Sequence, residues 1–319
     1  MRVNFRQFLG HDDTYSLRGI AMLMIIISHT HNGYPVEETG FFFPHWLNYL
    51  CIELWGAMGV GIFFFLSGYG LFLALDKRQG AITQEYVLSK VSRLLEPYII
   101  YWVVEIITLL LIDRNQLSLH LFRELITFSI HPDIENWFFK TIVPAYIVIF
   151  SLFKSGIGHK GKILSLFVIC LAYILIMRMA GFGLWWYNTI LCFPLGVFVA
   201  YNKGFFENLH PLIVCPLCVI LILVLHFIHF NSIVFNILFV FFSIYSIRII
   251  NINNRLLYFI GLNSFLFYFI ECPVMDEIVM FSYANYPLYC MLSVLGTFII
   301  SWICLKCVRM IKIRPQEHR

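Results

Sequence analysis

Long apolar runs alternate with short polar connections along nearly the whole chain. A membrane-spanning helix needs about 20 mostly apolar residues, and ten segments approach or exceed that length. We therefore predict an all-α polytopic membrane bundle of about ten transmembrane helices, and expect the amphipathic stretch 115–130 at the membrane interface. The predicted spans are 14–30, 50–75, 94–112, 136–153, 162–179, 184–201, 211–230, 232–250, 256–276 and 287–311.

Composition and charge agree with a membrane protein and indicate its orientation. Hydrophobic residues make up 60% of the chain and charged residues 13%, against roughly 25% charged residues in soluble domains. Because positive charge accumulates in cytoplasmic loops, both termini are expected in the cytoplasm, and no nucleic-acid partner is expected from the small net charge of +4. With this orientation, the 22 lysines and arginines all lie on the inner side except Arg114, Arg123, Lys140 and Arg178.

An arginine and a histidine bracket the first predicted span. Ionisable residues at such depth are costly in lipid, so they are candidates for function. Arg18 lies near the inner end and His29 near the outer end; at about 100° and 1.5 Å per residue they share one helix face, about 16 Å apart. The other candidates form an inner layer of Ser67, Lys90 and Arg93 and an outer layer of Glu53 and Glu271.

Each candidate also has a structural interpretation. The inner-layer cations are alternatively interfacial anchors that accumulate on the cytoplasmic side, and Ser67 alternatively packs one helix against another. His29 is alternatively an interfacial imidazole, because His31 follows it in an expected loop. The two glutamates alternatively pair with Lys140 or support helix packing.

The nine cysteines lie almost entirely in or beside predicted spans, at no metal-ligand spacing. Cys215 and Cys218 form a C-x-x-C pair, but it stands at the inner start of a span beside two prolines. We interpret this pair as small apolar residues rather than a redox or zinc site. The sequence thus predicts no metal site and no permanently bound cofactor.

Five stretches, taken in order, form a recognisable set: "LRGIAMLMIIISH", "GVGIFFFLSGYGL", "YVLSKVSRLLEPY", "NWFFKTIVPAY" and "LNSFLFYFIECPV". The set resembles the signatures of the acyltransferase-3 family of integral membrane acyltransferases, whose first helix reads Leu-Arg-Gly, an apolar run and His at this spacing. The resemblance covers nearly the whole chain, and the ten-span count fits it. Two positions differ: Gly61 stands where many members have an acidic residue, and Glu271 stands where the ninth-helix motif has histidine.

The resemblance implies transfer of an acyl group, usually acetyl from acetyl-CoA, to a hydroxyl group of a carbohydrate, polysaccharide or glycolipid. The chain, 1–319, would then be a single membrane-embedded acyltransferase domain in the bacterial inner membrane. Its partners would be the acyl-CoA donor, which is a substrate and not a resident cofactor, the acceptor and the lipid bilayer.

The two layers fit this chemistry. CoA carries phosphates that Arg and Lys bind, and a neutral imidazole oriented by a carboxylate can take the proton of the attacking hydroxyl. On this basis the expected catalytic residues are His29, Glu271 and Glu53, the donor-binding residues are Arg18, Lys90, Arg93 and Ser67, and the acceptor-binding residues are Trp137 and Lys140.

Two other classes of function stay open. A lipid-linked saccharide transporter or flippase would have discontinuous helices and internal repeats, and no repeat is visible in the sequence. A polysaccharide polymerase would carry a long outer loop, whereas the outer loops predicted here are short.

Overall fold

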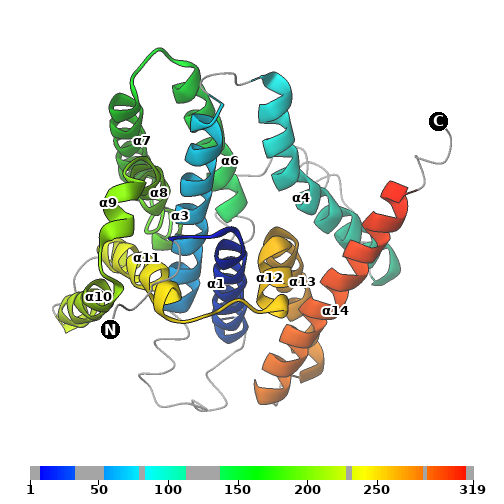
Figure 1. Ribbon diagram of the computed structural model, residues 1–319. Helices are drawn as coiled ribbons and strands as arrows, with labels where there is room; N and C mark the ends of the chain where they lie inside the picture. The colour runs from blue at the N-terminus through cyan, green and yellow to red at the C-terminus, as the bar shows by residue number, and fades with distance from the viewer. Residues whose placement is uncertain are drawn as a thin grey trace.

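The computed structural model describes residues 8–32, 54–78, 83–112, 137–227, 232–282 and 286–313. Within these ranges the chain forms helices joined by turns, without a strand (Figure 1). The helices are α1 (His11–Asn32), α3 (Trp55–Asp76), α4 (Gln84–Ile112), α6 (Trp137–Lys154), α7 (His159–Met179), the 3₁₀ turn η4 (Leu184–Trp186), α8 (Cys192–Tyr201), α9 (Lys203–Asn208), α10 (Pro211–Phe227), α11 (Ser232–Ile249), α12 (Arg255–Leu262), α13 (Ser264–Ser282) and α14 (Tyr286–Ile313).

Five of the described helices are long and apolar enough to cross a membrane: α3, α6, α7, α11 and α14. The pair α12 and α13, bent by 82° at its break, makes a sixth if it is one span. The all-helical membrane architecture is therefore confirmed, while the count of ten spans and the cytoplasmic termini stay predictions. The predicted span 184–201 differs from the structure, because α8 begins only at Cys192, after η4. The stretch 115–130 lies outside the described residues.

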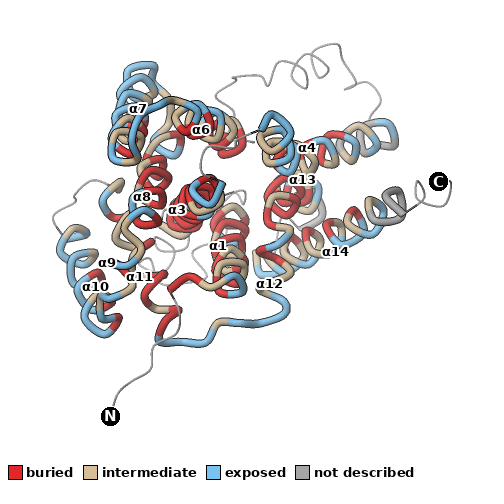
Figure 2. The backbone as a smooth tube through the Cα atoms, turned by 45° about the horizontal axis from the view of Figure 1, so that its top comes forward, coloured by how far each residue is buried: buried red, intermediate tan, exposed pale blue. Residues whose placement is uncertain are grey.

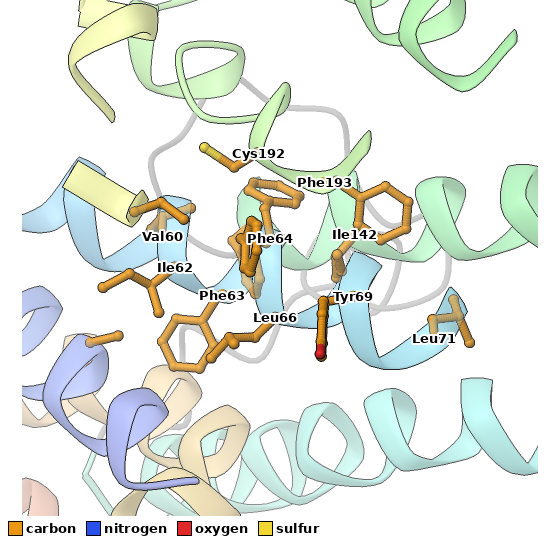
Figure 3. Packing of buried hydrophobic residues seen from close by; sticks show 14 of the residues in the cluster. Val60, Ile62, Phe63, Phe64, Leu66, Tyr69, Leu71, Ile142, Cys192 and Phe193 are labelled. Atoms are coloured by element: carbon orange, nitrogen blue, oxygen red, sulfur yellow. The ribbon is translucent and has the colours of Figure 1, made fainter. Parts of the chain in front are cut away.

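Helix α3 occupies the middle of the bundle and is buried on most of its surface (Figure 2). Its apolar side chains point in all directions, as in a helix surrounded by protein, and Figure 3 shows Phe64 and Leu66 among neighbours that include Phe193 of α8 and Ile142 of α6. By contrast, α7 and α10 expose large apolar side chains, including Leu164. Such a surface suits contact with lipid rather than water.

Two pairs of glycines allow neighbouring helices to approach to backbone contact. A Cβ atom on Gly68 of α3 would overlap the carbonyl oxygen of Phe193 in α8, and one on Gly196 would overlap that of Phe65. Small residues at helix interfaces permit this close packing in membranes. The Ser-Gly-Tyr stretch at residues 67–69 thus joins α3 to α8.

The second glycine pair joins α1 to α12. A Cβ atom on Gly19 would overlap the carbonyl oxygen of Leu257, and one on Gly261 would overlap that of Tyr15. The glycine of the Leu-Arg-Gly stretch is therefore a packing residue that holds the N-terminal half of α1 against α12. Immediately after α12 the chain turns by 82° into α13, which packs on α1 and α14 (Figure 1).

Candidate active site

His29 of α1 and Glu271 of α13 form a hydrogen-bonded pair across 242 positions of sequence. The distance from His29 Nδ1 to Glu271 Oε1 is 2.9 Å; the glutamate side chain is fully buried and the histidine side chain is 24% exposed. A carboxylate can only accept, so Nδ1–H donates and Nε2 keeps its lone pair. The geometry is that of a base oriented by a carboxylate.

The local sequence explains how both side chains reach this place. Arg18, Met22, Ile25 and His29 follow one another at spacings of four, three and four residues, so they form one stripe along α1. On α13, Pro273 follows Glu271 by two residues. Proline lacks an N–H group and interrupts the helical hydrogen bonds one turn back, which loosens the helix beside the pair.

Four cations from three segments of the chain lie near one another: Arg18, Arg78, Lys90 and Arg93. Lys90 precedes the predicted span 94–112, and its burial, together with the charges of Arg93, Arg78 and Arg18, lowers its pKa below the usual range. In the described part of the chain, none of the four forms an ion pair with a carboxylate. An array of cations without counter-charges attracts anions.

Aromatic side chains complete this cationic cluster. The ring of Tyr86 lies 3.9 Å from the Arg78 guanidinium carbon and 5.4 Å from the Lys90 ammonium nitrogen. Tyr146 of α6 lies beside both Arg18 and the buried Ser67 of α3. Among the described residues, Arg18 Nε is buried and has no hydrogen-bond partner.

A small apolar cavity of about 10 Å³ lies between the two polar groups, room for about one water molecule. Two residues of the α1 stripe, Met22 and Ile25, form part of its wall, and the rest comes from α3, α6 and α13. The other lining residues are Phe63, Phe138, Ser264, Phe265 and Tyr268. The cavity therefore lies on the helix face that joins Arg18 to His29.

The remaining predicted site residues are Trp137, Lys140 and Glu53. Trp137 begins α6 and is buried, with its ring against Phe138 and Trp186. In the described part of the chain no hydrogen bond or ring contact joins Trp137 to His29 or Glu271. Lys140, also on α6, is half-buried. Glu53 lies outside the described residues.

The expected loop position of His31 is wrong. Helix α1 continues to Asn32, and His31 is buried with its Nδ1 hydrogen-bonded to the hydroxyl of Tyr286 at the start of α14. The tertiary contact with α14 gives the imidazole a partner, and this favours one more helical turn over a solvated loop.

Sequence reasoning missed four residues at the site. From the sequence, Arg78 counted only as one of the lysines and arginines expected on the inner side. Its position between two predicted helices nevertheless placed it near the inner layer. Sequence reasoning gave no role to Tyr86 or Tyr146, whose place depends on which helices touch. It also missed Cys272, whose Sγ atom lies 4.0 Å from His29 Nδ1.

Comparison with known protein families identifies the type of domain. A family model of the acyltransferase-3 type, described as an acyltransferase domain, matches residues 16–306. No curated protein and no solved structure matches the chain. The matched range includes the cationic cluster, the cavity and the pair of His29 with Glu271.

Proposed function

This chain belongs to the acyltransferase-3 family, and we propose that it is an O-acetyltransferase that moves an acetyl group from acetyl-CoA to a hydroxyl of a carbohydrate, polysaccharide or glycolipid. The observation that carries the proposal is the 2.9 Å hydrogen bond between His29 and Glu271. It supplies an oriented imidazole at one end of an α1 stripe whose other end is cationic.

The cationic cluster supports a phosphate-bearing donor. CoA carries a diphosphate and a 3′-phosphate, and arginine binds such groups through paired donors while lysine acts as a point charge. Arg18, Arg78, Lys90 and Arg93 bind these phosphates in our proposal, with Ser67 beside them. The pantetheine arm then follows the stripe over about 16 Å, and cavity-lining side chains part to admit it.

The proposed reaction is direct acyl transfer. The acceptor oxygen attacks the thioester carbonyl carbon while His29 Nε2 takes the hydroxyl proton. The Glu271 carboxylate stabilises the imidazolium that results. The tetrahedral intermediate then collapses: the carbon–sulfur bond breaks, the ester forms, and the CoA sulfur leaves with the proton returned by His29.

The acceptor side of the proposal uses the outer ends of the helices. Trp137 stacks against a sugar ring and Lys140 lies beside it, as aromatic rings and cations do in carbohydrate sites, and Glu53 assists His29. Because Trp137 is buried against Trp186, the start of α6 must move to expose it. We place the protein in a bacterial inner membrane with both termini in the cytoplasm and with no nucleic-acid partner.

One observation favours a second candidate, a transporter or flippase of lipid-linked saccharides. The break of 82° between α12 and α13 resembles the discontinuous helices at which transporters bind their substrates. A transporter needs a gradient or a second compartment, whereas an acyltransferase in detergent turns over without either. The two candidates therefore separate in a test on purified protein.

The test follows release of free CoA thiol from acetyl-CoA by purified protein in detergent, with a panel of sugar and glycolipid acceptors. Wild type should release CoA and acetylate an acceptor. His29→Ala should lower kcat by about 10²- to 10⁴-fold, and Glu271→Gln should lower it less. His226→Ala, an exposed histidine at the end of α10, is the matched control. If His29→Ala turns over at the wild-type rate, the proposed mechanism is wrong.

A further inference from the structure

Cys272 brings a third metal-ligating side chain to the pair of His29 and Glu271. One donor atom from each of the three residues lies within 4.8 Å of the other two. The nearest distances are 2.9 Å from His29 Nδ1 to Glu271 Oε1 and 4.0 Å from His29 Nδ1 to Cys272 Sγ. This set of nitrogen, oxygen and sulfur donors comes from two helices, so no spacing in the sequence displays it.

We infer that His29, Glu271 and Cys272 form a reversible zinc site whose occupancy inhibits the enzyme. Zinc accepts all three donor types, whereas calcium and magnesium prefer oxygen alone. With bonds of about 2.0–2.3 Å and tetrahedral angles, the donors would lie about 3.4–3.6 Å apart. The histidine–glutamate distance must therefore lengthen and the histidine–cysteine distance shorten, each by about half an ångström.

Two features of the buried glutamate favour a cation there. Its second oxygen, Oε2, is buried and has no hydrogen-bond partner among the described residues, and such an oxygen gains a ligand when metal binds. The carboxylate and a Cys272 thiolate together also neutralise the double charge of zinc, which limits the cost of placing a cation away from water. Three protein ligands leave a fourth position for water.

Zinc binding would prevent His29 from acting as a general base. When Nδ1 coordinates zinc, the imidazole carries its proton on Nε2, so Nε2 has no lone pair to take a proton from an acceptor. Cys272 loses its thiol proton to solvent, and the hydrogen bond between His29 and Glu271 breaks. Zinc binding itself is independent of the proposed function; the inhibition rests on it.

Direct binding is tested on purified full-length protein in detergent, by competition between the protein and a chromogenic zinc indicator. Wild type should bind one zinc ion, and Cys272→Ser should weaken that affinity at least tenfold. Cys290→Ser is the matched control, because Cys290 is also half-buried and lies beside Thr30 of α1; it should bind as wild type does. Cobalt should give a thiolate absorption band in wild type and in Cys290→Ser, and not in Cys272→Ser.

Zinc should also stop CoA release in wild type, a chelator should restore it, and Cys272→Ser should need at least tenfold more zinc. Equal zinc affinity in wild type and Cys272→Ser overturns the site, and Cys272→Ala repeats the comparison if the serine variant does not fold. Zinc binding that depends on Cys272 in a chain without transferase activity leaves the site standing and rejects the proposed function. Transferase activity in a chain that binds no zinc would reject the zinc site and leave the proposed function standing.

Discussion

At the scale of single residues, His29 and His31 show how two neighbouring imidazoles on α1 acquire different roles. They point about 200° apart, so His29 meets Glu271 of α13 and His31 meets Tyr286 of α14. His31→Ala removes the hydrogen bond to the half-buried Tyr286 hydroxyl and the packing of a buried ring, and should cost about 1–3 kcal/mol of stability while kcat stays within about twofold of wild type. Thermal unfolding and turnover of the same preparations check this. A loss of kcat as large as that of His29→Ala would assign His31 to the reaction.

The arginines of the cationic cluster can be tested one at a time. Each charge-assisted phosphate contact is worth about 1.5–3 kcal/mol, so Arg18→Ala and Arg78→Ala should each raise the KM for acetyl-CoA about tenfold or more. Arg178→Ala, at an exposed position of α7, serves as the control and should leave the KM unchanged. Unchanged donor affinity in folded Arg18 and Arg78 variants would make both residues interfacial anchors.

Lys90 provides a chemical probe of the same cluster. Its pKa is lowered by burial and by three nearby arginines, so at a given pH more of its amine is neutral and nucleophilic. An amine-reactive label, quantified by mass spectrometry, should therefore modify Lys90, and CoA should protect it by supplying counter-charge and bulk. Lys154, exposed at the end of α6, should react equally with and without CoA. Equal labelling of Lys90 in both conditions would remove it from the donor site.

At the scale of helices, backbone contact between α3 and α8 depends on Gly68. A methyl group there meets the Phe193 carbonyl, whereas nothing lies within 4 Å of a Cβ atom on Gly70. Gly68→Ala should therefore destabilise the protein by about 1–3 kcal/mol through overpacking. Gly70→Ala, two residues along the same helix, should be neutral or stabilising by up to about 1 kcal/mol. Unfolding curves in one detergent compare the two, and equal stability would mean that the helices separate without cost.

At the scale of helices, the sequence could predict the features that depend on the periodicity of apolar residues. Apolar runs located most helices, and the stripe from Arg18 to His29 lies on one face of α1 as the spacing indicated. The shared outer layer suggested that His29 meets a glutamate, and the structure places Glu271 there. Periodicity does not state which helices touch, so it could not find Cys272. Nor could it foresee the 82° break before α13, where hydrophobicity continues while the backbone turns.

At the scale of the whole molecule, the bundle contains two polar sites, the cationic cluster and the pair of His29 with Glu271. They lie toward opposite ends of one face of α1. Helix α3 lies at the centre of the bundle, and α7 and α10 lie at its edge with many exposed residues (Figure 2). Helix α1 carries the stripe between the sites. The cavity midway along this stripe has a volume of about 10 Å³, so its apolar lining would have to part for an uncharged pantetheine arm, and the same lining would exclude the charged phosphates. In the proposed reaction, a donor of this shape would span both sites, with its charged end at the cationic cluster and its thioester at His29.

This arrangement predicts that the path of the pantetheine arm can be blocked without changing the cationic cluster or the pair of His29 with Glu271. Ile25 lines the cavity, and Ile25→Phe should fill it, lowering kcat/KM for acetyl-CoA by about 5- to 150-fold if the arm must displace the added bulk at a cost of 1–3 kcal/mol. Inhibition by adenosine 3′,5′-bisphosphate, which has phosphates but no arm, should be unchanged. Ile27→Phe, at an exposed position on another face of α1, is the control for bulk in the same helix. A folded Ile25→Phe enzyme with wild-type kcat/KM would show that the donor reaches His29 by another path.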